Sequence, residues 1–259
     1  MAISRSLLIL KLKALSVHLT ISLVLVGIAL ALMLLQWFPP PLFTTDGGGL
    51  GLKLLILVDL VLGPVLTFIV FNPAKGKRQL TFDLGVIAVF QLAAFGYGLW
   101  NIHGVRVQTL AFHEGQFHSV TASRYAEQEI AADGWQRLGS DAPYMVNTRE
   151  PETGEEGAGV AAYGFMSAIE PYELHFLYEP FAQTTAGYTL AELEAAQPRL
   201  AATARQWLVR KGLDGKSARF YRLTGFYDNA VLALDEQGRR LGGFAGELPP
   251  KPGIKPSSP

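Results

Sequence analysis

The sequence of 259 residues contains no cysteine. This absence excludes disulfide bonds, thiolate metal sites and cysteine nucleophiles. The sequence also lacks the motifs G-x-S-x-G and H-E-x-x-H and a Walker-type phosphate loop. These motifs mark common classes of hydrolases, metalloproteases and nucleotide-binding enzymes. We therefore predict a protein that is not an enzyme, with no catalytic residue, no metal ligand and no cofactor.

Charged residues are scarce and unevenly placed. They form 17% of the chain, with 22 basic and 22 acidic residues. Residues 1–104 hold seven Lys/Arg and three Asp, whereas residues 105–259 hold 15 basic and 19 acidic residues. No basic stripe is present, so nothing indicates a nucleic-acid partner. The neutral total therefore combines a basic, apolar part with a mildly acidic part of mixed composition, which predicts two domains.

The clearest signal is the apolar stretch from Lys53 to Phe71. A helix of this length spans roughly 28 Å, which is about the hydrocarbon thickness of a bilayer. Gly63-Pro64 removes a backbone donor and predicts a kink near the middle of the helix. Asp59 places a carboxylate inside the run, at a cost of about 2.5–3.5 kcal/mol on insertion scales. We expect Asp59 either to contact another helix or to lie protonated or hydrated near the interface.

Two further apolar runs flank this stretch, at residues 14–38 and 82–102. A signal peptide is an alternative for the first, because Ala29-Leu30-Ala31 has the pattern of a cleavage site. The run is longer than a signal-peptide core, however, and more spans follow it. We therefore predict a membrane domain over residues 1–104, with helices at about 14–38, 53–71 and 82–102. Pro39-Pro40-Pro41 ends the first helix, and a short flexible loop follows at 42–52.

The charges of the loops predict the orientation. Residues 1–13 and the loop 74–81 each carry three Lys/Arg, whereas the loop 42–52 carries none. The positive-inside rule places both basic segments in the cytoplasm. Three crossings then put everything after His103 across the membrane, which is the periplasm in a Gram-negative bacterium. We predict a multi-pass inner-membrane protein with a cytoplasmic N-terminus.

Residues 105–248 have the pattern of a small α+β domain on the periplasmic side. Alternating apolar residues predict strands at 105–112, 116–122, 143–150, 219–226, 230–236 and 240–248. Helical composition predicts helices at 123–138 and at 190–212, the second divided by Pro198. The acidic, glycine-rich segment 151–159 is predicted to be an exposed loop, and the proline-rich tail 249–259 to be disordered. The fold class is a three-helix transmembrane bundle followed by this periplasmic domain.

Polar residues of the second domain offer two weak alternatives. His113 and His118 with Glu114 could be arranged as a metal site, but their spacing matches no known ligand pattern. Three glutamates also lie close in sequence, namely Glu170, Glu173 and Glu179. Paired acids can serve a glycosidase. Such acids more often line a solvated rim, so we favour neither site.

The pattern D-x-x-x-G-P followed by F-N-P resembles the type IV pilin accessory proteins of the TfpX/TfpZ (FimB-like) family. It is carried here by Asp59, Gly63, Pro64, Phe71, Asn72 and Pro73. The resemblance extends over residues 10–105, while the second domain is similar only in length, acidity and strand-rich ending. It implies a chaperone-like inner-membrane protein that assists a cognate type IV pilin, through pilin stabilisation or pilus assembly. Other pilus-assembly proteins are further partners that it implies.

From the resemblance and the kinked, polar second span we hypothesise that the helices dock the transmembrane helix of the pilin. The second domain would contact the periplasmic head of the pilin. The candidate partner-binding residues are Asp59, Gly63, Pro64, Asn72, Pro73 and Asp83. Asp83 has a simpler explanation as an interfacial acid beside basic neighbours and a helix N-terminus. The alternative function is a membrane-tethered sensor or binding module for a periplasmic ligand, although the predicted cytoplasmic segments are too short for a signalling domain.

Overall fold

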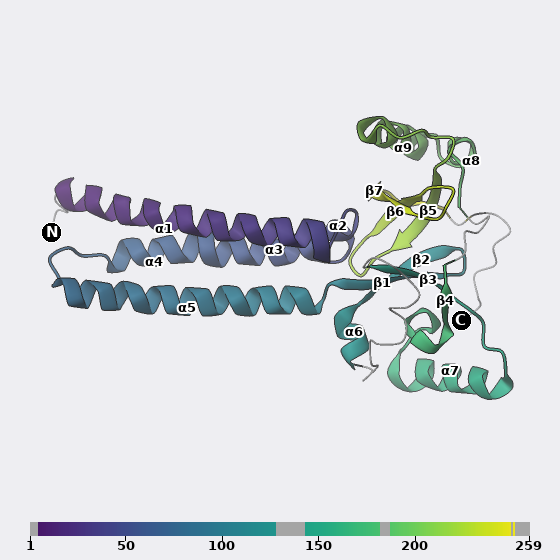
Figure 1. Ribbon diagram of the computed structural model, residues 1–259, viewed down its shortest axis with the longest axis horizontal. Helices are drawn as coiled ribbons and strands as arrows, with labels where there is room; N and C mark the ends of the chain where they lie inside the picture. Colours follow the sequence, from purple (N-terminus) through teal and green to yellow (C-terminus); the bar gives the residue numbers. More distant parts are fainter. Residues whose placement is uncertain (1–4, 128–142, 182–186, 250, 252–259) are drawn as a thin grey trace. The chain divides into compact units, whose positions relative to one another are not determined.

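The computed structural model describes residues 5–127, 143–181, 187–249 and 251 (Figure 1). The chain forms two compact units. We call the first, Met1–Leu35 with Gly48–Gly104, the helical unit. We call the second, Gln36–Gly47 with Val105–Pro259, the sheet unit. The chain therefore passes between the units at three points, since the segment between the first two long helices belongs to the sheet unit.

Three long helical rods form the helical unit. The first is α1 (Arg5–Leu32), which continues into η1 (Met33–Trp37). The middle rod consists of α3 (Gly48–Ile56), η2 (Leu57–Leu62) and α4 (Gly63–Val70), and the third is α5 (Lys77–Gly104). All three are long and apolar enough to cross a membrane. Each rod begins before its predicted start at residue 14, 53 or 82. Leucines and lysines precede the first apolar run and Lys77 and Arg78 precede the third, and these residues are good helix formers.

The middle rod changes its geometry at the Gly63-Pro64 pair. The six residues of η2 form a π-helical turn, in which the N–H of Gly63 bonds the carbonyl of Val58. Pro64 then sits in the first turn of α4, where its missing N–H is least costly. A π-turn before a proline accommodates the lost donor without ending the helix. Asp59 lies in this turn and is buried.

The sheet unit is built on a seven-stranded mixed sheet in the order β4-β3-β1-β2-β5-β6-β7 (Figure 1). Neighbouring strands are antiparallel except for the pairs β1–β3 and β2–β5, which are parallel. Glu114 and Gly115, both with positive φ, turn the β1–β2 hairpin. The predicted α+β class is confirmed. The strands are β1 (Val107–His113), β2 (Gln116–Thr121), β3 (Tyr144–Thr148), β4 (Tyr178–Pro180), β5 (Arg219–Thr224), β6 (Asn229–Leu234) and β7 (Arg240–Ala245).

Helices cover the sheet from separate parts of the chain. Pro198 divides α8 (Leu190–Ala196) from α9 (Pro198–Lys211), as predicted. The apolar side of α9, with Trp207 at its centre, packs with Phe220, Val231 and Phe244 into one core cluster. Of the helix predicted at 123–138, α6 (Ala122–Glu127) is present, and residues 128–138 lie outside the described part of the chain. Most of the predicted disordered tail also lies outside it.

The prediction of an exposed loop at 151–159 is wrong. Helix α7 (Gly154–Ser167) occupies most of this segment. The hydroxyl of Thr153 accepts a hydrogen bond from the Glu156 N–H at 3.1 Å, which caps the helix. Glu155 and Glu156 lie in its first turn, where the helix dipole favours acids. Glycine content suggested a loop, but the cap and the acids together favour a helix.

The predicted flexible loop at 42–52 is also corrected. Its second half begins α3, and its first half contains the short helix α2 (Leu42–Thr45), which packs within the sheet unit. The carbonyl of Thr45 accepts the Tyr227 N–H at 2.8 Å. A Cβ on Gly225 would lie 2.6 Å from that of Thr45, so only glycine permits this approach. The segment is therefore an integral part of the sheet unit.

Asp46 anchors this segment through buried hydrogen bonds. Its side chain is 2% exposed and accepts hydrogen bonds from the Phe226 N–H at 3.1 Å, the Ser119 hydroxyl and the Thr45 hydroxyl at 2.6 Å. Burial raises the pKa of Asp46, while these three hydrogen bonds lower it in part. The carboxylate thus connects the segment to β2 and to the turn between β5 and β6.

Candidate partner-binding site

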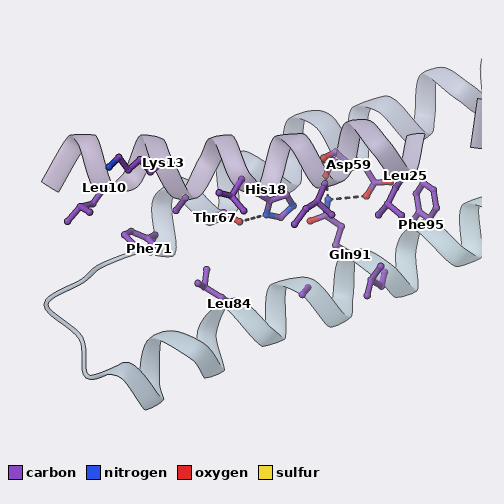
Figure 2. A pocket seen from close by; sticks show the side chains of 16 residues that line it. Leu10, Lys13, His18, Leu25, Asp59, Thr67, Phe71, Leu84, Gln91 and Phe95 are labelled. Atoms are coloured by element: carbon purple, nitrogen blue, oxygen red, sulfur yellow. Dashed lines mark hydrogen bonds between the residues drawn. The ribbon is translucent and has the colours of Figure 1, made fainter. Parts of the chain in front are cut away.

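A cavity of about 500 Å³ runs along the helical unit (Figure 2). Its lining comes from all three rods, with eight residues from α1, five from α5 and three from the middle rod or its end. On α1 the lining extends from Leu10 to Leu25, which corresponds to roughly 22 Å of helix at 1.5 Å per residue. The cavity is therefore elongated along the helices.

The packing of the rods explains the cavity. Both α1 and α5 pack against the middle rod but scarcely against each other. The space between α1 and α5, alongside the middle rod, is therefore left unfilled by side chains of the described residues. Most residues around it are apolar, such as Ile21, Leu92 and Phe95. An elongated apolar groove bounded by two helices has the geometry that receives a further helix.

Asp59 and Gln91 form a polar pair in this groove, toward the end lined by Leu25 and Phe95 (Figure 2). Asp59 is 1% exposed. The Gln91 Nε2 donates to Asp59 Oδ1 at 3.0 Å and to the Asp59 carbonyl at 3.3 Å. Within the described residues, Asp59 Oδ2 and Gln91 Oε1 are buried without a hydrogen-bond partner. A buried acceptor without a donor is costly, so this pair is incompletely satisfied in the protein alone.

Gly63 makes room for the glutamine. A Cβ placed on Gly63 would lie 2.2 Å from the carboxamide atoms of Gln91. Any larger residue would push the Gln91 side chain away from Asp59. The Gly63-Pro64 pair thus has a positioning role, because Pro64 accompanies the π-turn that carries Asp59 and Gly63 leaves the space beside it.

Further polar contacts join α1 to the middle rod. His18 Nδ1 lies 2.6 Å from Thr67 Oγ1 (Figure 2). Lys11 Nζ donates to the carbonyl of Phe68 at 3.0 Å, near the end of α4. Lys13 lines the cavity at the same end. One flanking helix is therefore tied to the middle rod through a histidine, and the other through a glutamine.

The structure divides the predicted site residues into two groups. Asp59, Gly63 and Pro64 are buried in the middle rod, and Asp59 lines the cavity. The other three lie at the turn between α4 and α5 or at the start of α5. Asn72 Oδ1 accepts the Ala74 N–H at 3.0 Å, and Asp83 pairs with Lys75 Nζ at 2.5 Å. Asn72, Pro73 and Asp83 are not among the residues that line the cavity.

Sequence reasoning missed five polar residues of the cavity, namely Lys13, His18, Ser22, Thr67 and Gln91. A usable signal was present, because polar side chains inside a spanning helix almost always face the interior of a bundle. Gln91 in particular interrupts the apolar run at 82–102 close to its middle. What the sequence did not specify was the pairing of Gln91 with Asp59, since that depends on how the rods pack.

In the sheet unit, His113 and His118 lie on the same face of the β1–β2 hairpin. The His118 ring stacks on Tyr172 with centroids 4.0 Å apart. Among the described residues, no group of three or more His, Asp or Glu could hold a metal ion. Burial lowers the pKa of His118 to about 4, with His113 and Arg222 acting in the same direction. This arrangement fits a neutral histidine packed in a structural contact.

Acidification is expected to destabilise the sheet unit through His118. Its pKa is about 4 when folded and about 6.5 when unfolded, so the unfolded state binds the proton first. The contribution of His118 to stability is complete above pH 6.5 and is lost as the pH falls to 4. Because the ring is partly exposed, we expect a loss of about 2–3 kcal/mol. Between pH 4 and pH 7, the free energy of unfolding of His118→Phe should depend less steeply on pH than that of the unchanged protein. An equal pH dependence of the two would contradict this assignment.

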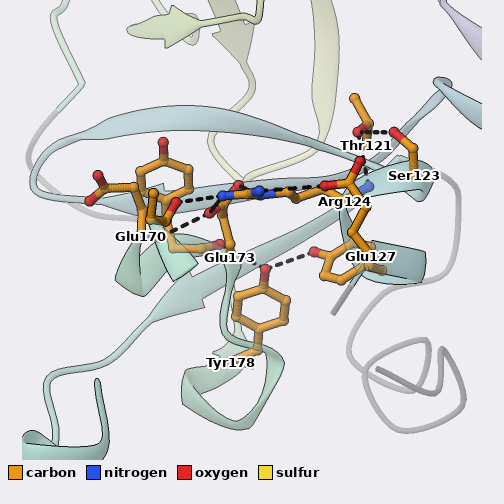
Figure 3. A network of polar contacts seen from close by, with 10 residues as sticks. Thr121, Ser123, Arg124, Glu127, Glu170, Glu173 and Tyr178 are labelled. Carbon is orange, nitrogen blue, oxygen red and sulfur yellow. Dashed lines mark hydrogen bonds and ion pairs between the residues drawn. The ribbon is translucent and has the colours of Figure 1, made fainter. Parts of the chain in front are cut away.

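Of the three glutamates Glu170, Glu173 and Glu179, Glu173 is held in a network of polar contacts (Figure 3). Arg124 donates to both carboxylate oxygens of Glu173, at 2.7 and 3.0 Å. Glu173 also accepts the Glu170 N–H at 2.9 Å. Beneath this pair, the hydroxyls of Tyr125 and Tyr178 lie 2.7 Å apart. Because Arg124 engages Glu173 in a bidentate pair, this acid serves the fold and is not poised as one of two opposed catalytic carboxylates.

The sequence is similar to fimbrial assembly proteins of Dichelobacter nodosus. Over 160 residues the chain is 29% identical to the fimbrial assembly protein of serogroup I from Dichelobacter nodosus. The aligned region covers 60% of this chain and 62% of that protein. Over 96 residues it is 32% identical to the protein of serogroups C1 and C2, covering 37% of this chain and 73% of the relative. The serogroup E1 protein is 36% identical over 97 residues, which is 37% of each chain.

The chain therefore spans less than two thirds of the serogroup I protein, but it covers more than two thirds of the serogroup C1 and C2 protein. No family model and no solved structure matches the chain. The predicted resemblance is confirmed at the level of fimbrial assembly. By its similarity to these relatives, the chain belongs to the family of fimbrial assembly proteins.

Proposed function

We propose that this protein assists the assembly of a type IV pilus by holding the transmembrane helix of a pilin subunit in the groove between α1 and α5. The elongated cavity over Asp59 and Gln91 carries the proposal. Family membership supports it, because the relatives are named for fimbrial assembly. The protein would lie in the inner membrane with its N-terminus in the cytoplasm, and the sheet unit would contact the pilin head in the periplasm.

The shape of the cavity favours a helix as the occupant. Its lining runs for roughly 22 Å along α1, a large part of the thickness of a bilayer. Helices in lipid associate through close packing and through polar contacts between them, and this groove offers both. The volume of about 500 Å³ also fits a small ligand of the kind a sensor would bind. The two possibilities give different crosslinking results.

The test is site-specific photocrosslinking in cells that make the pilus. A photoreactive residue at Ile21, which lines the cavity, is compared with one at Val24, which does not. Both lie on α1 and are almost equally exposed, at 56% and 57%. We expect the pilin to crosslink through its apolar helix from Ile21 and not from Val24. Equal crosslinking from both positions, or none from Ile21, would contradict the proposal.

A further inference from the structure

We infer that the groove selects a helix that carries a positively charged hydrogen-bond donor, such as an amine or a guanidinium, at the depth of Asp59. The inference rests on the proposed function, because it assumes that the occupant of the groove is a helix. It adds the chemical group by which that helix is recognised. Two acceptors of the cavity lining that have no hydrogen-bond partner among the described residues carry it.

The position of Asp59 makes the requirement strong. It lies eleven residues from either end of the span Gly48–Val70, at the middle of the rod. A carboxylate is most costly at the centre of a bilayer, and there it normally pairs with an opposite charge or a donor. Gln91 satisfies Oδ1 with one N–H, which leaves Oδ2 without a donor among the described residues.

The neighbouring donors are already engaged or lie elsewhere. His18 is bound to Thr67 through Nδ1, and its ring interacts electrostatically with Asp59 but forms no hydrogen bond to Asp59 Oδ2. Lys11 donates to backbone carbonyls near the end of α4, and Lys13 lies at that same end of the cavity. Neither lysine bonds to Asp59 within the described part of the chain. The missing donor is therefore expected to come from outside this chain.

The chemistry of the two free atoms defines the class of group. Asp59 Oδ2 and Gln91 Oε1 are both acceptors, and they belong to two side chains already joined by a hydrogen bond. An ammonium has three donors and a guanidinium has five, so one such group can serve both oxygens. An ionised carboxylate or a carbonyl on the incoming helix has no donor and would add repulsion, and a protonated carboxyl group offers only one donor. The groove should therefore discriminate between helices by charge as well as by shape.

The experiment uses the full chain in lipid nanodiscs and synthetic leucine–alanine transmembrane helices as probes. One probe carries lysine at its centre, a second carries leucine there, and a third carries glutamate. We expect the lysine helix to bind at least about tenfold more tightly than the leucine helix, and also more tightly than the glutamate helix, which offers at most one donor. In Asp59→Asn, which keeps the size of the side chain, the preference for lysine should fall severalfold or vanish.

Equal binding of the lysine and leucine helices would overturn the inference. A lysine preference that persists unchanged in Asp59→Asn would overturn it as well, since the charge would then act elsewhere. These outcomes are separable from failure of the proposed function. If the pilin crosslinks from Ile21 but lysine gives no advantage, the groove holds a helix without selecting its charge.

Discussion

Replacing Ala88 with tryptophan is expected to reduce the recovery of pilin with this protein by about tenfold or more. Ala88 lies on α5 and lines the cavity. An indole ring at this position would occupy space that we assign to the pilin helix, and overpacking of a fitted contact costs about 1–3 kcal/mol. Ala88 is exposed in the free protein, so the substitution should leave the packing of the three rods intact.

The matched control for this prediction is Ala93→Trp. Ala93 is also an exposed alanine of α5, but it does not line the cavity. Both variants are measured by co-purification of pilin in mild detergent and by the number of surface pili. Normal recovery with Ala88→Trp would show that this groove is not where the pilin binds. An equal loss of pilin recovery with Ala93→Trp would point to a general effect of tryptophan on the helical unit.

Replacing Asp46 with alanine is expected to destabilise the sheet unit by about 2–4 kcal/mol. The variant removes the acceptor of the Phe226 N–H and of the Ser119 hydroxyl. Each donor left buried without a partner costs about 1–3 kcal/mol. The loss should appear in the strands that receive the segment, β2 and β5. Hydrogen exchange of peptides from these strands, measured on the whole protein in detergent, should become at least about tenfold faster.

Asp46→Asn separates the hydrogen bonds from the charge. The asparagine oxygen can still accept from Phe226 and Ser119, and its amide group can donate to the Thr45 hydroxyl. Burial raises the pKa of Asp46, which means that the charged form is disfavoured at this place. We therefore expect Asp46→Asn to be neutral or slightly stabilising. If the asparagine and alanine variants lose equal protection, the charge itself holds the segment in place and this explanation fails.

Hydrophobic patterns alone predicted most of the architecture. The three apolar runs predicted three spanning helices because a bilayer demands about 20 apolar residues per crossing. Alternation predicted the hairpins β1–β2 and β5–β6, since a strand with one buried face repeats every two residues. The aromatic stretch that contains β4 has neither period clearly, and its three-residue strand was not predicted. Composition also failed at α7, where a threonine cap and two acids outweigh the glycines.

The candidate site was predicted only in part, because it depends on contacts between distant segments. Asp59 was recognisable as a charge in an apolar run, and Gly63-Pro64 as a disturbance of the helix. The partner Gln91 lies 32 residues further along the chain. The space that Gly63 leaves for it exists only once α5 packs on the middle rod. Asn72 and Pro73 belong to the same sequence pattern as Asp59, whereas Asp83 lies outside it, and the contacts of Asn72 and Asp83 form the turn between α4 and α5.

The membership of residues 36–47 in the sheet unit bears on how parts of such proteins can be exchanged. A hybrid joined at Gly104 alone would combine a transplanted sheet with a short helix inherited from the recipient. The incoming counterparts of Ser119, Gly225 and Phe226 would then face a foreign counterpart of Asp46. A functional transplant therefore has to carry two pieces of sequence, one of them from between the first two spans. The sheet unit is therefore encoded by two separate stretches of the gene, although it forms one compact unit in space.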